Sequence, residues 1–255
     1  MKGVRTEALL LRSVDFGESD RIVHLLVPDS GRLTAIAKGA RRSVRRFSGT
    51  LDLFNHLRVQ MQTRRSGAMA RLEQATLIES FTPLRNETRR FAIACYLLEV
   101  LDRLAPEGGA RGDMRRLFRF ALAALRAAAT RTPDARLRVF IELRALEALG
   151  LRPELRRCVR CGVWLDGAAQ IDFHVADGGT LCARCAAPLD GLLRVHAGTL
   201  RALEQGLRFD FEHLDRLVLG PAALTESRQL VGSFQRYHVG VELRSQRFLD
   251  EILPA

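Results

Sequence analysis

The sequence has 255 residues, 47% of them hydrophobic, which is enough to bury an ordinary core and fits one large domain or two to three small ones. Its formal net charge of +11 favours an anionic partner such as nucleic acid or a membrane surface, although nearly all cations are arginines and genomic base composition can contribute to that bias. No apolar run reaches the roughly 20 residues that cross a bilayer, and no secretory apolar segment follows Met1, so we expect a cytoplasmic protein.

The first eighty residues have the pattern of a small β-barrel. Short apolar runs, some alternating with polar residues, predict five strands separated by turn-rich segments. Five short strands in this length are typical of the five-stranded oligonucleotide-binding (OB) barrel, and an SH3-like barrel fits almost as well. We therefore predict an OB-type nucleic-acid-binding domain over residues 1–80. Its predicted strands cover residues 4–12, 20–27, 32–39, 55–63 and 70–80.

The turn after the first predicted strand carries three acids, Asp15, Glu18 and Asp20. They could in principle bind a metal ion. The simpler interpretation is a solvated turn in which one acid pairs with Arg21.

A dense group of cations follows the third predicted strand. Residues 1–157 carry a net charge of +13 and residues 158–255 a net charge of −2, so an anionic partner should contact the N-terminal part. The segment Lys38–Phe47 reads KGARRSVRRF and contains no acid. In an OB barrel such loops flank the groove for single strands, where cations contact phosphates and aromatic rings stack on bases. A solvated loop without a partner is the alternative. The candidate DNA-binding residues are Lys38, Arg41, Arg42, Arg45 and Arg46, with Phe47 and Phe54 as rings and Arg64 and Arg65 in the next turn as further cations.

Beyond Pro83 the apolar period changes to that of helices. Phe91, Cys95 and Leu98 fall on one line of a wide apolar stripe, so we expect Cys95 to be a core thiol. We predict an α-helical domain over residues 81–255, and hence an α+β multidomain protein. The predicted helices cover residues 91–104, 113–129, 133–149 with Gly150 as the C-cap, a segment starting near His196, 222–240 and 243–252.

Four cysteines interrupt the helical region with the spacing of a metal site. Cys158 and Cys161 form CVRC, and Cys182 and Cys185 form CARC twenty residues further on. Two residues between thiolates let each pair reach one tetrahedral ion at about 2.3 Å, as in zinc ribbons and knuckles. We predict one structural Zn²⁺ in an inserted module over residues 155–190, with a two-stranded ribbon between the pairs. The alternatives are unmetallated or redox thiols and a site in which His174 replaces one ligand.

Catalytic motifs are missing from the sequence. There is no GxxxxGK[ST] phosphate loop, and the DFG triplet at residues 15–17 has no kinase context. We therefore predict that the protein is not an enzyme.

Four quoted stretches resemble one family over nearly the whole chain. They are GESDRIVHLLVPDSGRLTAIAKGARR, YLLEVLDRLAPEG, ELRALEALGLRPEL and YHVGVELRSQRFLDEI, and they resemble the RecO family of bacterial DNA repair proteins from about Arg5 to Ile252. KGARR and LRSQRFL are the most specific pieces, whereas some members of that family lack the cysteines. The resemblance implies a nucleoid-associated recombination mediator. Such a protein binds single- and double-stranded DNA, anneals complementary strands, works with RecR, and helps load RecA onto strands coated with single-stranded-DNA-binding protein (SSB).

A second basic line lies on the helix predicted over residues 113–129, at Arg115, Arg116 and Arg119. It could extend the DNA path, receive the acidic C-terminal tail of SSB that the resemblance implies as a ligand, or be a solvated helix face. Two other classes of protein share parts of the pattern. One is a zinc-containing RNA-binding or ribosome-associated factor, and the other is an enzyme with a metal cofactor.

Overall fold

The structure is a computed structural model that describes residues 2–63 and 69–253. The chain divides into two compact units, residues 1–130 and 131–255. The sequence-based division into domains 1–80 and 81–255, with a module over 155–190, remains a prediction. Among the described residues, no helix combines the length and the hydropathy that a membrane span requires.

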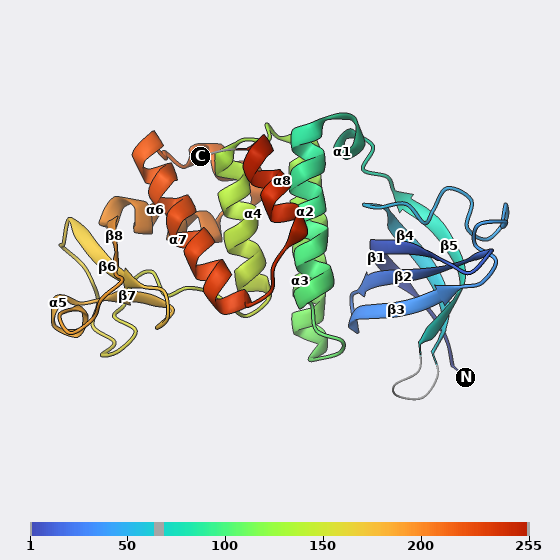
Figure 1. Cartoon of the computed structure of the whole chain (residues 1–255), viewed down its shortest axis with the longest axis horizontal. Helices are drawn as coiled ribbons and strands as arrows, with labels where there is room; N and C mark the ends of the chain where they lie inside the picture. The colour runs from blue at the N-terminus through green and yellow to red at the C-terminus, as the bar shows by residue number, and fades with distance from the viewer. Residues whose placement is uncertain (1, 64–68, 254–255) are drawn as a thin grey trace. The chain divides into compact units, whose positions relative to one another are not determined.

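The first unit begins with a closed β-barrel (Figure 1). The strand order around the barrel is β1-β2-β3-β5-β4, and β4 pairs with β1 to close it. All pairs are antiparallel except the short parallel pair of β3 and β5. This connectivity is that of an OB barrel, so the predicted fold class is confirmed. The strands are β1 (Lys2–Phe16), β2 (Asp20–Val27), β3 (Gly31–Ala37), β4 (His56–Thr63) and β5 (Ala70–Glu79).

Every second side chain along the strands points into the barrel and fills its interior. Leu10 on β1, Val23 and Leu25 on β2, and Leu57 and Val59 on β4 belong to one buried cluster. Because successive side chains of a strand point to opposite sides, their neighbours in sequence lie on the outer surface. A barrel of this size is filled by its own side chains, so ligands must bind on its outside or at its loops.

Helices cover part of the outer surface of the barrel. α2 (Thr88–Leu104) and α3 (Arg111–Thr130) pack on β1, β2 and β3, after the short α1 (Pro83–Asn86). Within this region Asp102 of α2 lies 2.6 Å from Nδ1 of His24 and 3.2 Å from Nε of Arg32. Burial alone would raise the pKa of the Asp102 carboxyl, but the bonds to His24 and Arg32 outweigh burial and lower its pKa. Asp102 therefore ties α2 to the barrel as a carboxylate.

The second unit is mainly helical. α4 (Ala135–Ala148) packs against α6 (Ala197–Arg208) and α7 (Pro221–Val239), followed by α8 (Arg244–Ile252); a 3₁₀ helix spans Phe211–Arg216. The packing of α4 on α6 requires a glycine, because a Cβ at Gly206 would lie 1.9 Å from Cε1 of Phe140. Buried Arg138 donates to the carbonyl oxygens of Leu249 and Leu253, which fixes the end of α8 on α4.

The sheet near the cysteines differs from the prediction. It has three strands in the order β7-β6-β8, whereas the sequence predicted a two-stranded ribbon. β6 (Gln170–His174) pairs with β7 (Gly179–Leu181) and also with β8 (Leu193–His196), which follows the second cysteine pair and the short α5 (Ala183–Ala186). The third strand forms because Val195 pairs with Ile171 and both side chains are buried.

Candidate nucleic-acid interface and four-cysteine centre

The basic segment forms an ordered loop between β3 and β4. Consecutive turns are closed by hydrogen bonds from the Arg42 amide to the Gly39 carbonyl (3.2 Å) and from the Arg46 amide to Oγ of Ser43 (3.1 Å). The left-handed backbone of Gly39, with φ of 65°, lets the chain turn directly after β3. The loop is also bonded to β5, because the Ala75 amide donates to the Arg46 carbonyl at 3.1 Å. We refer to residues 38–47 as the basic loop.

The rings predicted to stack on bases are buried. Phe47 is 4% exposed within the barrel cluster, and Phe54 is 1% exposed and packs edge-on against Phe91. The prediction that these two rings are available to bases is therefore wrong. Because the loop closes over the barrel, the Phe47 ring buries more surface by packing inward than by facing solvent, whereas Val44 of the same loop is 81% exposed. Phe47 anchors the loop and holds its polar side outward.

The cations of the basic loop lie on that outward side. Lys38, Arg41, Arg42 and Arg45 are exposed. Arg46 is half-buried, donates to the Lys38 carbonyl at 2.7 Å and lies over the Phe47 ring at 5.1 Å. Four cations thus face solvent, and the fifth also stabilises the loop.

Acids at the end of β1 and in the turn that follows it face two of these cations. Arg41 lies 3.5 Å from Asp15, and Arg42 lies 3.9 Å from Glu18. Arg21 also pairs with Asp15, at 3.0 Å, as the sequence suggested. Exposed pairs of this kind contribute little energy, so a phosphate can displace the acid. Lys38 and Arg45 have no acidic partner within 4 Å among the described residues.

The remaining candidate cations are placed differently. Arg64 and Arg65 lie outside the described residues. On α3, Arg115 bonds to Asp29 and Arg116 to Asp113, while Arg119 is exposed. Two of the three cations predicted on α3 are therefore paired with nearby acids.

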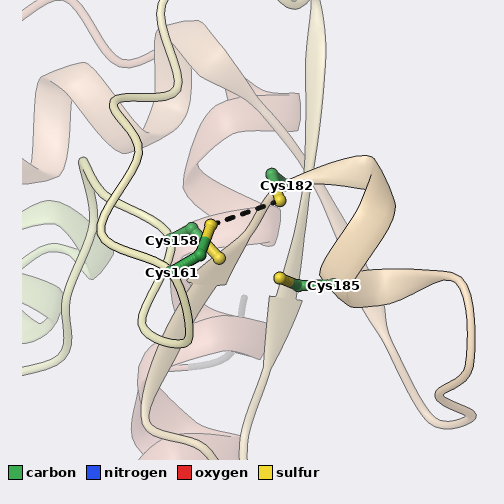
Figure 2. Close-up of side chains that lie close together, drawn as sticks. All are labelled: Cys158, Cys161, Cys182 and Cys185. Carbon is green, nitrogen blue, oxygen red and sulfur yellow. Dashed lines mark hydrogen bonds between the residues drawn. The ribbon is translucent and has the colours of Figure 1, made fainter.

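The two cysteine pairs converge from separate elements (Figure 2). Cys158 and Cys161 lie in a tight turn closed by the Gly162 amide, which donates to the Cys158 carbonyl at 2.8 Å. Cys182 is the N-cap of α5, and Cys185 lies within that helix. The four sulfurs point toward a common centre, and all lie within 4.8 Å of one another.

This geometry fits a tetrahedral metal ion. Four sulfurs at about 2.3 Å from an ion are separated by about 3.8 Å in a regular tetrahedron. The sulfurs of Cys161 and Cys182 are 3.7 Å apart. His174 is not part of this cluster, and its Nδ1 lies 3.2 Å from a carboxylate oxygen of Asp177. The donor set is thus four thiols.

Backbone amides lower the pKa of the Cys158 and Cys182 thiols, whereas the side-chain hydrogen bond with Cys182 raises the pKa of Cys185 to about 12. Burial acts to raise the pKa of the Cys158 thiol, but backbone N–H groups of Cys182, Cys161 and Arg160 outweigh it and lower the pKa to about 6. A side-chain hydrogen bond to Cys161 raises the pKa of Arg184. In the sequence, only the arginine within CARC signals this contact. By contrast, burial raises the pKa of Cys95 to about 11, as expected for a core thiol.

Together these features define a class of protein: an OB barrel with a cationic loop, joined to a helical body that carries a four-cysteine centre.

The chain belongs to the RecO family of DNA repair and recombination proteins. Residues 1–81 match the family described as Recombination protein O N terminal, and residues 85–247 match Recombination protein O C terminal. The chain is 38% identical over 257 residues to "DNA repair protein RecO" of Anaeromyxobacter sp. (strain K), covering 100% of this chain and 98% of that relative. The protein of the same name from Symbiobacterium thermophilum is 32% identical, with 98% of this chain and 97% of that relative covered. The resemblance found in the sequence is thereby confirmed.

Proposed function

We propose that this chain is a recombination mediator that binds single- and double-stranded DNA, anneals complementary strands, and with RecR promotes RecA loading on SSB-coated single strands. The observation that carries the proposal is the ordered basic loop on an OB barrel, in a chain that resembles RecO proteins over its full length. Family membership favours DNA over the alternative of an RNA-binding or ribosome-associated factor.

Annealing requires that two polyanions approach each other while their bases stay exposed. The basic loop can neutralise phosphates without contacting the pairing edges of bases. Lys38, Arg41, Arg42, Arg45 and Arg46 are the proposed phosphate contacts. If all five act, log K falls by about 3.5 per decade of salt, or about a hundredfold between 50 and 200 mM. No bond in the DNA changes, so the proposed activity needs no catalytic residue.

We propose that Cys158, Cys161, Cys182 and Cys185 hold one structural Zn²⁺. The ion supplies a tetrahedral cross-link between two segments that are far apart in sequence. In the apolar cluster around it, only Leu181 and Ala186 of the described residues are buried besides Cys158, and the apolar residues packed against them are partly buried: Val159, Leu165, Leu189 and Leu192. A module with so little core depends on metal binding for its folding energy, as other small zinc modules do.

The proposed partners follow from family membership. They are DNA, RecR, the acidic C-terminal tail of SSB and, indirectly, RecA; we propose no membrane partner and place the activity at the nucleoid. Arg119 on α3 is the exposed cation of its line that has no acidic partner within 4 Å among the described residues, and it is a candidate contact for an acidic tail or for DNA.

Strand annealing tests the proposal. Complementary strands precoated with SSB are mixed without nucleotide, and duplex formation is followed with wild type, a loop variant and a control variant. Wild type should anneal fast, the loop variant should lose most of the rate, and the control should keep it. Absence of annealing by zinc-loaded wild type, with preferential binding of structured RNA, would sink the proposal. The loop variant is Arg41→Ala/Arg42→Ala/Arg45→Ala, and the control is Arg194→Ala/Arg208→Ala/Arg247→Ala, three exposed arginines of the second unit.

A further inference from the structure

An apolar row crosses the outer face of the barrel at the end of the β1–β2 hairpin. Val14 on β1 pairs with Ile22 on β2, and Ile22 pairs with Ile36 on β3. The inward-facing neighbours Val23 and Ala35 are fully buried, so the row itself lies outside the barrel. Val14 is 43% exposed, and Ile22 and Ile36 are half-buried.

Phe16 extends this row at the last position of β1. It is two residues beyond Val14, on the same face of the strand, and its side chain is 52% exposed. Phe16 and the three aliphatic side chains together form an exposed apolar patch at the hairpin end.

The other half of the same outer face is covered. Leu9 and Leu26 pair across β1 and β2, lie on the outer side and are fully buried, in the region where α2 and α3 pack. His24 lies between the two halves and bonds to Asp102 of α2. The helices therefore account for the apolar residues near Leu9, whereas the row at the hairpin end stays open to solvent.

The basic loop is bonded to the turn that follows the exposed row. The Arg41 amide donates to the Ser19 carbonyl at 3.0 Å, and the Gly39 amide donates to Asp20 at 2.8 Å, so the basic loop is fixed to the hairpin turn. Acids at the end of β1 and in that turn are paired: Asp15 with Arg21 and Arg41, and Glu18 with Arg42. The basic loop therefore adjoins Phe16 through the hairpin turn, where the Glu18–Arg42 pair is exposed and exchangeable, whereas Asp15 lies on the other side of β1 from Val14 and Phe16.

We propose that Phe16, with Val14, Ile22 and Ile36 beside it, is a base-stacking platform for single-stranded nucleic acid whose phosphates bind the basic loop. This inference rests on the proposed function and adds to it a contact to the bases. A single strand carries flat apolar bases and an anionic backbone side by side, which matches an apolar row that ends next to a cationic loop. The face of strands 2 and 3, with the adjoining β1–β2 loop, is also where OB barrels commonly hold oligonucleotides.

The platform divides binding into two components. Phosphate contacts at the basic loop depend on salt, whereas stacking on Phe16 does not. Loss of one stacked base weakens binding by roughly 5- to 150-fold. A duplex keeps its bases stacked inside, so the platform should contribute nothing to duplex binding.

An abasic oligonucleotide separates the two components. Wild type, Phe16→Ala, Phe16→Trp and the control Tyr237→Ala, an aromatic side chain of the second unit that is 61% exposed, are titrated with three ligands of equal length. The ligands are oligo(dT), an abasic deoxyribose-phosphate strand, and duplex DNA. Phe16→Ala should weaken oligo(dT) binding at least fivefold, leave abasic and duplex binding within about twofold, and leave the salt slope unchanged. Phe16→Trp should bind oligo(dT) as well as wild type.

Two results would overturn the platform while leaving DNA binding in place. One is wild type binding oligo(dT) and the abasic strand equally, and the other is Phe16→Ala weakening all three ligands alike. A variant that binds every ligand normally but loses affinity for RecR would assign the patch to a protein partner and also overturn the inference. If wild type binds none of the three ligands, the proposed function itself fails.

Discussion

The cations of the basic loop fall into two kinds, and this difference gives a quantitative prediction. Arg41 and Arg42 each face an acid, at 3.5 and 3.9 Å, whereas Lys38 and Arg45 have no acidic partner within 4 Å among the described residues. A phosphate gains the full interaction with an unpaired cation. The double variant Lys38→Ala/Arg45→Ala should therefore lose two complete phosphate contacts.

The expected loss follows from counterion release. Each single-strand phosphate contact contributes about 0.7 to the slope of log K against log salt concentration, so the slope should fall by about 1.4. If wild type and variant converge near 1 M salt, the variant binds about 65-fold more weakly at 50 mM and about tenfold more weakly at 200 mM. Glu18→Gln should instead strengthen single-strand binding, because it leaves Arg42 without a competing carboxylate.

Fluorescence anisotropy with a labelled oligo(dT), repeated over a salt series, measures both quantities. The control is Arg194→Ala/Arg247→Ala, which removes two arginines that are 77% and 90% exposed in the second unit. A Lys38→Ala/Arg45→Ala slope equal to that of wild type, or a control slope that falls as far, would refute the assignment of phosphate contacts to the loop.

Three further predictions concern stability. Gly206→Ala places a methyl group against the Phe140 ring and should lower the free energy of unfolding by about 3 kcal/mol, as measured in urea. The lowered pKa of Asp102 means that its ion pairs stabilise the fold above its unfolded pKa near 3.8 and that this contribution is lost as the pH falls through the lower folded value. Asp102→Asn should therefore cost about 3 kcal/mol at neutral pH and little in strong acid; an equal loss at both would contradict the ion-pair account. Cys161→Ser should reduce bound zinc well below one per chain and lower Tm, whereas Cys95→Ser should keep full zinc; metal analysis and calorimetry distinguish the two, and normal zinc in Cys161→Ser would disprove four-thiolate binding.

The sequence predicted the barrel well because alternation has a direct physical cause. Each strand of the first unit buries one side, so its apolar residues recur with period two, and the five predicted strands match β1 to β5 within a few residues except that β1 is longer. The four cysteines were equally predictable, because C-x₂-C spacing reports a local turn and not a distant contact.

The misses all depend on long-range packing. The local sequence around Phe47 does not distinguish a ring that faces solvent from one that faces the barrel. The ring is buried because the loop crosses β5. The strand at 193–196 has only four residues and exists because it pairs with β6. The pairing of Arg41 with Asp15 joins positions 26 residues apart in sequence through the docking of a loop on a hairpin turn.

The proposal that DNA binds at the basic loop of the barrel can be tested by hydrogen exchange. The zinc-loaded protein is measured with and without single-stranded DNA. DNA should slow the exchange of backbone amides in residues 38–47 and in the adjoining hairpin, residues 14–24, and should leave the exchange of residues 158–185 unchanged. Protection confined to residues 131–255, with the basic loop exchanging at its free rate, would contradict the proposal.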